Sequence, residues 1–390
     1  MSFVRDSIVR RSDGTHVNLG DLINEDGTIK VKFEGGGAPG EAVDEEAREM
    51  AQSAKFKDYA RKETVPRGFV DEVPVFEKHP GNPIFKRDDA AWLLSNKYAM
   101  YWPSVIHAKA IYPNALDEFY MYYSTDHAAD KGGIGLTTAP HPLGPWTDRG
   151  RVFYDDAEGS GHTETPSVVF NEVTGKFHMY YHIDYYAGGG TVYRSQATCL
   201  ATSDDGLTWT RYSGNPIITT SEPEFTGDGH CGYARVYRQG RMWVAHHLLG
   251  GGGTYKLGVS YSEDGIKWQI DPRPIVGFTD ILEDKEKTRI EFHHTFPFSF
   301  KSKQWIVCTI SPFETGFNSA KKKMVVARFE HARNIHSIYP GIDEGDAGEW
   351  DAGALKQPQV LAYQGKLYLF YAANGLNNKG AIGVAVAEVV

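Results

Sequence analysis

The sequence is short of cysteine and of long apolar runs. Its 390 residues include three cysteines, Cys199, Cys231 and Cys308, which lie far apart. An odd number of distant cysteines forms neither a disulfide framework nor a metal-ligand spacing. No apolar run reaches membrane-spanning length, and segment 1–11 lacks the apolar core of a secretory signal peptide. These absences predict a soluble protein that is cytoplasmic, or that is exported or virion-associated by another route.

Clustered positive charge is also absent. The formal net charge is −9, and the 41 lysine and arginine residues form no stripe or run. Proteins that bind nucleic acids or anionic membranes concentrate lysine and arginine on one surface. We therefore expect neither a nucleic-acid partner nor a membrane partner.

Aromatic residues and glycine, by contrast, are abundant. Aromatic residues make up 13% of the chain, and there are 42 glycines. Aromatic side chains favour β-strands, while glycine favours turns and bulges. The composition therefore favours an all-β protein built from many short strands.

The N-terminal extension, residues 1–75, has a different composition from the rest. It contains short alternating β patches, a glycine-rich linker over 35–40, and segment 41–63, which is rich in Ala, Glu, Lys and Arg. That last composition predicts a helix over 41–63. The helix would either dock on the main domain or pair with a second copy, so we expect a homo-oligomer formed through this extension.

A repeat of about sixty residues begins near residue 76. Each unit contains an aromatic strand followed by a further strand, and a closed ring of such units is a β-propeller. Segment 82–86 is positioned to supply the missing outer strand of the last unit. The sequence thus predicts a five-bladed β-propeller over 76–390, with aromatic strands at 118–124, 176–183, 241–248, 303–310 and 366–372.

Two hairpin sequences recur almost unchanged. Residues 203–209 read SDDGLTW and residues 262–268 read SEDGIKW, with a looser version at 138–146. Glycine supplies the turn, and tryptophan is expected to close the hairpin against the neighbouring blade. We interpret these motifs as structural.

The hairpins, together with the N-P-I segments at 82–84 and 215–217, resemble those of five-bladed glycoside hydrolases of families 43, 32, 68 and 117. The resemblance covers about residues 76–390. Among these families, family 117 resembles the chain in one further feature, since its members also have an N-terminal helical extension, which they use in dimerisation. The resemblance implies a sugar site at the mouth of a central funnel, with catalytic carboxylates where the innermost strands begin.

Acidic residues stand at the expected strand starts of three blades. Glu164, Asp228 and Glu291 are about one repeat apart, so all three are predicted to face the funnel and carry the acid and base work. On blade one, where the families usually have aspartate, this chain has Trp102. By resemblance to family 117, His293 or its neighbour His294 is a further candidate general acid, and we assign this role to His293.

Other polar and aromatic residues near these strand starts are predicted to bind substrate. Trp102 would serve as a stacking platform. The remaining predicted substrate-binding residues are His107, His230, His294, Lys356 and Gln357. The chemistry requires no cofactor, and a structural divalent ion on the propeller axis remains an open alternative.

These observations favour a glycoside hydrolase that acts on a chain end, because a funnel admits chain ends best. Its partner would be the end of an oligosaccharide or polysaccharide. The alternative is a non-catalytic carbohydrate-binding propeller, such as a receptor-binding or adhesion protein, including a virion-associated one. The missing acid of blade one favours this alternative.

Overall fold

The computed structural model describes residues 8–10, 16–18 and most of 72–389. Within that last range, its description leaves out 94–99, 126–131, 156–162, 187–193, 220–229, 252–253, 272–274, 276–289, 313–322, 347 and 374–379.

The chain divides into two compact units, Met1–Pro66 and Arg67–Val390. In the first unit, β1 (Ile8–Arg10) pairs antiparallel with β2 (His16–Asn18). The helix predicted over 41–63 lies outside the described residues, as does the predicted role of the extension in oligomerisation.

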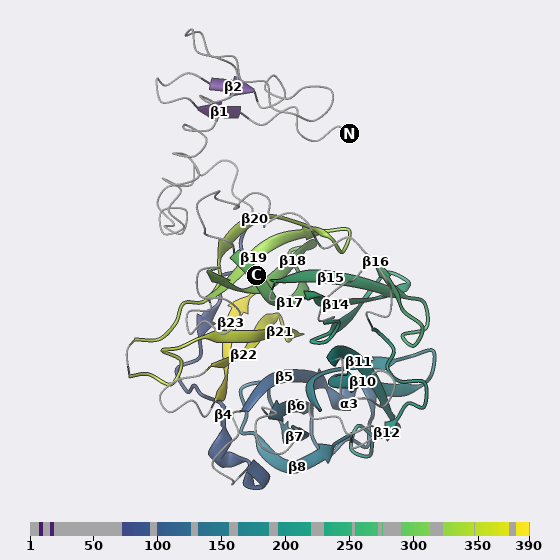
Figure 1. Ribbon diagram of the computed structural model, residues 1–390. Helices are drawn as coiled ribbons and strands as arrows, with labels where there is room; N and C mark the ends of the chain where they lie inside the picture. Colours follow the sequence, from purple (N-terminus) through teal and green to yellow (C-terminus); the bar gives the residue numbers. More distant parts are fainter. Residues whose placement is uncertain are drawn as a thin grey trace. The chain divides into compact units, whose positions relative to one another are not determined.

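The second unit is a five-bladed β-propeller, as the sequence predicts (Figure 1). No helix in the described part of the chain is long and apolar enough to cross a membrane.

The blades are numbered in chain order, and each begins with its innermost strand. Blade one contains β5 (Met100–His107), β6 (Phe119–Thr125), β7 (Ile134–Ala139) and β8 (Thr147–Phe153). Blade two contains β9 (Glu164–Asn171), β10 (Lys176–Tyr186), β11 (Arg194–Ser203) and β12 (Thr210–Arg211). Blade three contains β13 (Arg235–Gln239), β14 (Met242–Gly251), β15 (Thr254–Ser262) and β16 (Gln269–Asp271). Blade four contains β17 (Ile290–Phe300), β18 (Lys303–Pro312), β19 (Lys323–Glu330) and β20 (Asn334–Pro340). Blade five contains β21 (Leu355–Tyr363), β22 (Lys366–Ala373) and β23 (Ala381–Glu388).

Blade five is completed by the N-terminal part of this unit. Both β4 (Phe85–Lys86) and β3 (Glu77–Lys78) pair antiparallel with β23, so the expectation for segment 82–86 is confirmed and β3 is an additional contributor. Asn82 strengthens the closure, because its side chain donates to the carbonyl of Val384 and accepts from the N–H of the same residue, both over 2.9 Å. The short helices of this unit are η2 (Arg87–Asp89), η3 (Ala91–Leu93) and α3 (Ala108–Ile111).

The hydrophobic core lies between blades. In the described residues, five hydrophobic clusters each join the facing sheets of two neighbouring blades. The second strand of a blade is therefore covered on both faces, and every residue of β6 is buried. This explains why the aromatic strands are continuous apolar runs rather than alternating ones.

The repeated hairpins fasten each blade to the one before it. Asp205 accepts hydrogen bonds from the backbone N–H groups of Leu207 and Thr208, over 2.8 and 2.9 Å. Burial raises the pKa of Asp205, but these bonds and one from Ser203 outweigh it and lower the pKa overall. Tyr122 of blade one donates to the carbonyl of Gly206 over 2.7 Å. The hairpin therefore joins two blades, in agreement with the structural role predicted for this motif.

The hairpin of blade three repeats this arrangement one blade later. Tyr180 of blade two donates to the carbonyl of Gly265 over 2.7 Å. The Trp268 ring packs edge-on against Tyr180 at 5.7 Å between centroids. The first hairpin makes the equivalent ring contact, Trp209 against Tyr122 at 5.6 Å, so both hairpins fasten their blade to the preceding one by the same two contacts.

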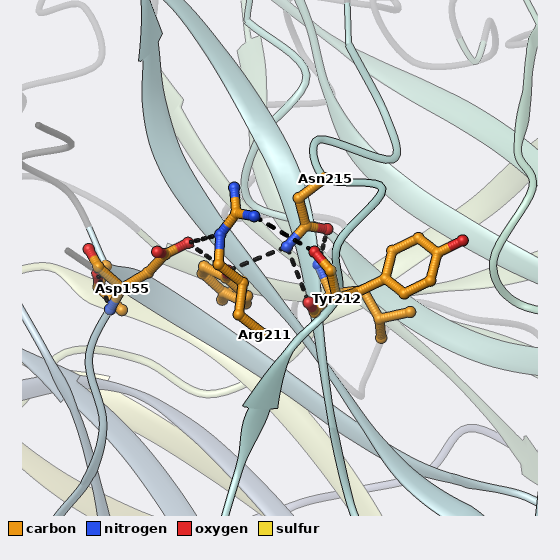
Figure 2. Close-up of polar contacts among 7 residues, drawn as sticks. Asp155, Arg211, Tyr212 and Asn215 are labelled. Atoms are coloured by element: carbon orange, nitrogen blue, oxygen red, sulfur yellow. Dashed lines mark hydrogen bonds and ion pairs between the residues drawn. The ribbon is translucent and has the colours of Figure 1, made fainter. Parts of the chain in front are cut away.

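A buried polar cluster ties the outer part of blade two together (Figure 2). The carboxylate of Asp155 accepts from the Tyr181 hydroxyl over 2.5 Å and from Nε of Arg211 over 3.0 Å. Asn215 donates to the Tyr181 oxygen and to the carbonyl of Leu200, over 3.2 and 2.9 Å. Burial, reinforced by the Asp155 charge, raises the pKa of Tyr181, so its hydroxyl stays protonated and able to donate.

Blade five contains an equivalent cluster made of other residues. Asp351 accepts from the Tyr371 hydroxyl over 3.3 Å and forms an ion pair with Lys78 at 2.7 Å. Asn82 donates to the Tyr371 oxygen over 3.3 Å. Because a similar group stands at a similar place in two blades, we interpret it as part of the blade architecture.

Candidate functional site

The innermost strands of three blades carry the same irregularity near their start. In each, two residues, the second of them proline, lie opposite a single tyrosine of the next strand, which is the arrangement of a β-bulge. The three bulges are Trp102-Pro103 opposite Tyr123, Thr165-Pro166 opposite Tyr181, and Gln357-Pro358 opposite Tyr371.

The first residue of each bulge has a left-handed backbone, and blade three has a counterpart. The φ angles are 63° at Trp102, 57° at Thr165 and 60° at Gln357, and Tyr233 of blade three has 62°. A positive φ is uncommon for bulky or β-branched residues and is often found at functional sites. On β17 of blade four, the strand pairing shifts between Phe292 and His294.

Five aromatic and imidazole rings from four blades meet at this level. We call them the axial cluster: Trp102, His182, His230, Tyr233 and His294. Trp102 and Tyr233 lie 4.8 Å apart between ring centroids, and Trp102 and His294 lie 4.3 Å apart. His182 and His230 lie 4.8 and 4.7 Å from Tyr233. Because Trp102 and Tyr233 belong to blades one and three, their contact crosses the space enclosed by the inner strands.

Hydrogen bonds between neighbouring inner strands hold the cluster in place. The Oγ atom of Ser104 accepts from the N–H of Val168, and Oγ of Ser167 accepts from that of Val236, over 2.9 and 3.0 Å. Gln359 does the same for blade one, since its Oε1 accepts from the N–H of Val105 over 2.5 Å. In each bond a side chain of one blade satisfies a backbone donor of the next.

Of the three acids predicted for the site, Glu164 is the one whose side chain lies in the described part of the structure. It lies at the first position of β9, is 4% exposed, and pairs in register with His182. Directly opposed residues of antiparallel strands project to the same face, with Cβ atoms about 4.5–5.5 Å apart. The carboxyl group of Glu164 and the imidazole of His182 therefore share one face of the blade.

Gly232 makes room for two imidazoles. A Cβ atom added there would overlap the His182 ring and lie 3.0 Å from the His230 ring. The absence of a side chain at Gly232 therefore permits the close approach of blades two and three at the axial cluster.

Arg235, at the first position of β13, is a buried cation next to the cluster. It is 2% exposed, donates from Nη1 to the carbonyl of Pro166 over 3.0 Å, and has its guanidinium carbon 5.5 Å from the Trp102 ring centroid. Burial lowers the pKa of Arg235 to about 9, so the side chain is still charged at neutral pH.

The structure brings together several of the residues predicted from the sequence. Trp102, His230 and His294 belong to the axial cluster, Glu164 lies beside His182, and Gln357 accepts a hydrogen bond from the backbone N–H of Trp102. Trp102 is 4% exposed, because Tyr233, His294 and Arg235 cover its ring.

Two other predicted residues lie at different places. Lys356 immediately precedes the blade-five bulge, and its Nζ atom is 5.2 Å from the Tyr101 ring centroid. His107 is the last residue of β5, five residues beyond Trp102, where it stacks on Phe119 and contacts Glu118. At about 3.3 Å per residue, His107 is separated from the axial cluster along the strand.

The remaining predicted residues are only partly within the described structure. Glu291 and His293 lie on β17, with their side chains outside the described part, and Asp228 lies outside it altogether. Their predicted roles remain predictions.

Sequence reasoning missed three residues of this region, His182, Tyr233 and Arg235. His182 belongs to an aromatic strand, where core packing is the usual role. The repeated X-Pro dipeptides at Trp102-Pro103, Thr165-Pro166 and Gln357-Pro358 are the signal that could have located the bulges.

The three cysteines are buried, and none of them forms a disulfide. Burial raises the pKa of the Cys231 thiol to about 12, so it is protonated at neutral pH and is a poor nucleophile. Within the described residues, no group of three or more His, Cys, Asp or Glu is placed to hold a metal ion.

No family model matches the chain. Solved structures share its fold at low identity. An N-acetylgalactosamine deacetylase from F. plautii, in complex with blood group B trisaccharide, is 13% identical over 81% of this chain and 96% of that one, with a TM-score of 0.61. A thermostable family-43 glycoside hydrolase is 15% identical over 74% and 89%, with a TM-score of 0.53. The Bombyx mori GH32 β-fructofuranosidase BmSUC1 is 14% identical over 89% and 67%, with a TM-score of 0.52.

These likenesses confirm the resemblance to propeller glycoside hydrolases at the level of the fold. They do not confirm family 117. Because proteins of this fold include a deacetylase as well as glycosidases, the fold alone does not select the reaction.

Proposed function

We propose that this protein is a glycoside hydrolase that removes residues from the end of a short oligosaccharide bound beside the axial cluster. Glu164 and two further acids, Asp228 and Glu291, carry the acid and base work. One carboxyl group protonates the leaving oxygen, while another acts on the opposite face of the sugar, directly or through water. His230 and His293 assist proton transfer, since imidazole titrates near neutral pH.

The placement of Glu164 carries this proposal. A carboxyl group is rarely buried without purpose, because desolvation of its charged form is costly. Glu164 is buried at the start of an innermost strand, opposite His182, at the level where rings from four blades meet. One solved structure of similar fold, the F. plautii deacetylase, is in complex with blood group B trisaccharide, which adds support for a sugar ligand.

The second candidate function is carbohydrate binding without catalysis. One observation favours it: blade one places Trp102 where the resembling families usually have a catalytic aspartate, and that ring packs against Tyr233 and His294. At the position of Trp102, blade one therefore contributes an indole ring to the site and not a carboxylate.

Turnover of a panel of aryl glycosides and oligosaccharides by the full chain separates the two functions. Under the first proposal, a hydrolysed substrate is found, and Glu164→Gln lowers kcat by at least a hundredfold while the protein remains folded. Asp228→Asn and Glu291→Gln test the other two acids in the same assay.

A matched control is Glu388→Gln. Glu388 is an exposed acid that pairs with Lys366 on blade five, so its replacement should leave turnover unchanged. Sugar binding without product release would instead support the second candidate. Turnover that persists in all three acid variants would rule out the assignment of these carboxylates.

A further inference from the structure

Arg235 joins three blades at the level of the site. It belongs to β13 of blade three, and its two terminal nitrogens donate to carbonyls of two other blades. Nη1 donates to Pro166 of blade two over 3.0 Å, and Nη2 donates to Gln357 of blade five over 3.4 Å. Both acceptors are bulge residues, so the guanidinium links two of the bulges that shape the site.

The contacts of Arg235 form a closed triangle with two predicted substrate-binding residues. Arg235 donates to the Gln357 carbonyl, the Gln357 side chain accepts from the N–H of Trp102 over 3.1 Å, and the Trp102 ring lies over the guanidinium. Moving any one of these three groups therefore disturbs the other two.

No carboxylate pairs with Arg235 in the described structure, and its Nε has no hydrogen-bond partner there. Retaining a cation in such a place costs free energy, because burial disfavours the charged form. An apolar residue of similar size would avoid this cost, but it would leave the carbonyls of Pro166 and Gln357 without the guanidinium donors. The triangle gives a reason for the arginine, since its members lie within the site.

We propose that Arg235 is a positioning residue of the sugar site, which sets the places of Trp102, Gln357 and the strand start that carries Glu164. The inference rests on the proposed function. Arg235 does not touch the substrate; it acts by fixing the two bulges and the indole ring relative to each other.

The geometry requires arginine rather than a cation in general. The planar guanidinium reaches two carbonyls at once and offers a flat face to the indole, whereas a lysine ammonium is a compact charge without that plane. Arg235→Lys therefore retains the charge and removes the fork, while Arg235→Met removes both.

The test compares Arg235→Lys with Arg87→Lys. Arg87 is also buried and donates to a backbone carbonyl, that of Leu93, but it lies in η2, outside the inner strands. We expect Arg235→Lys to lower kcat/KM at least tenfold and Arg87→Lys to change it less than twofold, at similar losses of stability. Full activity of Arg235→Lys would overturn the proposal. This holds also if Arg235→Met is impaired, because the positive charge alone would then be enough for activity.

A second readout does not depend on hydrolysis. The fluorescence of Trp102 is obtained as the difference between proteins with Trp102 and with Trp102→Phe, in the wild-type and Arg235→Lys backgrounds. A changed Trp102 emission in Arg235→Lys supports the positioning role. If the wild-type protein hydrolyses none of the substrates, that absence of turnover counts against the proposed function and not against the positioning role. An unchanged emission overturns the inference whatever the activity, and so does failure of both Arg235→Lys and Arg235→Met to fold.

Discussion

The backbone N–H of Trp102 donates a hydrogen bond of 3.1 Å to Oε1 of Gln357, and this bond joins the first blade to the last. Both residues have left-handed backbones at the bulges of their strands. The closure of the propeller and the shape of its candidate site therefore depend on the same pair of residues.

Replacement of Gln357 by leucine should destabilise the protein. The variant leaves the buried N–H of Trp102 without its acceptor, which costs about 1–3 kcal/mol of unfolding free energy. Urea denaturation measures the loss. Gln364→Leu is the control, because Gln364 is an exposed glutamine of the same blade, and it should change the free energy by less than about 0.5 kcal/mol. Equal stability of the two variants would show that the bond between the blades contributes nothing.

Gly232→Ala should impair ligand binding as well as stability. The new Cβ would overlap the His182 ring and crowd the His230 ring, so the axial cluster has to shift. Gly240→Ala is a control at a position with φ of 59° and open space around the Cβ, where strain alone costs about 1 kcal/mol. Sugar affinity, measured by calorimetry, should fall for Gly232→Ala and remain at the wild-type value for Gly240→Ala.

Stability should fall as the pH is lowered from about 6.5 towards 3. Burial lowers the pKa of His246 to about 3 and that of His247 to about 4, against about 6.5 in an unfolded chain. The unfolded state therefore binds more protons in this range, and each histidine removes about 2 kcal/mol of unfolding free energy by pH 5.

Urea midpoints at pH 8, 6 and 5 test this dependence. His247→Gln removes one of the two groups and should flatten the pH dependence, whatever it does to the stability at pH 8. A slope identical to that of the wild type would show that His247 does not contribute.

Removal of one tyrosine hydroxyl from either buried polar cluster should have similar effects. Tyr181→Phe takes a hydrogen bond from Asp155, and Tyr371→Phe takes one from Asp351. Each change should cost about 1–3 kcal/mol, because a buried carboxylate loses a donor. The clusters belong to different blades and share no residue, so the costs should add in the double variant. Guanidinium denaturation measures them, and a double variant no less stable than either single one would contradict independent clusters.

The repeat determined the fold from the sequence alone. The aromatic strands are recognisable because they recur about every sixty residues, and the structure explains their continuous apolar sequence, since a second strand such as β6 is buried along its whole length. The contribution of segment 82–86 to the last blade followed from the need to close the ring, and β4 confirms it. The hairpins at 203–209 and 262–268 were recognisable because their hydrogen bonds are local.

The candidate site could be predicted only in part. Glu164, His230 and Gln357 were found because they stand at or near strand starts. His182, Tyr233 and Arg235 were not, because strand periodicity gives no sign of a side chain that contacts other blades near the axis.

Only the tertiary structure decided which side chains meet. A bulge changes the direction of each side chain beside it, and its effect depends on the neighbouring blades, whose residues are distant in the sequence; Trp102 and Gln357 are 255 positions apart. The sequence by itself determined the five blades, since their pattern is local and repeated. The triangle of Arg235, Gln357 and Trp102 required the folded ring, because its members come from three blades that meet only when the propeller closes.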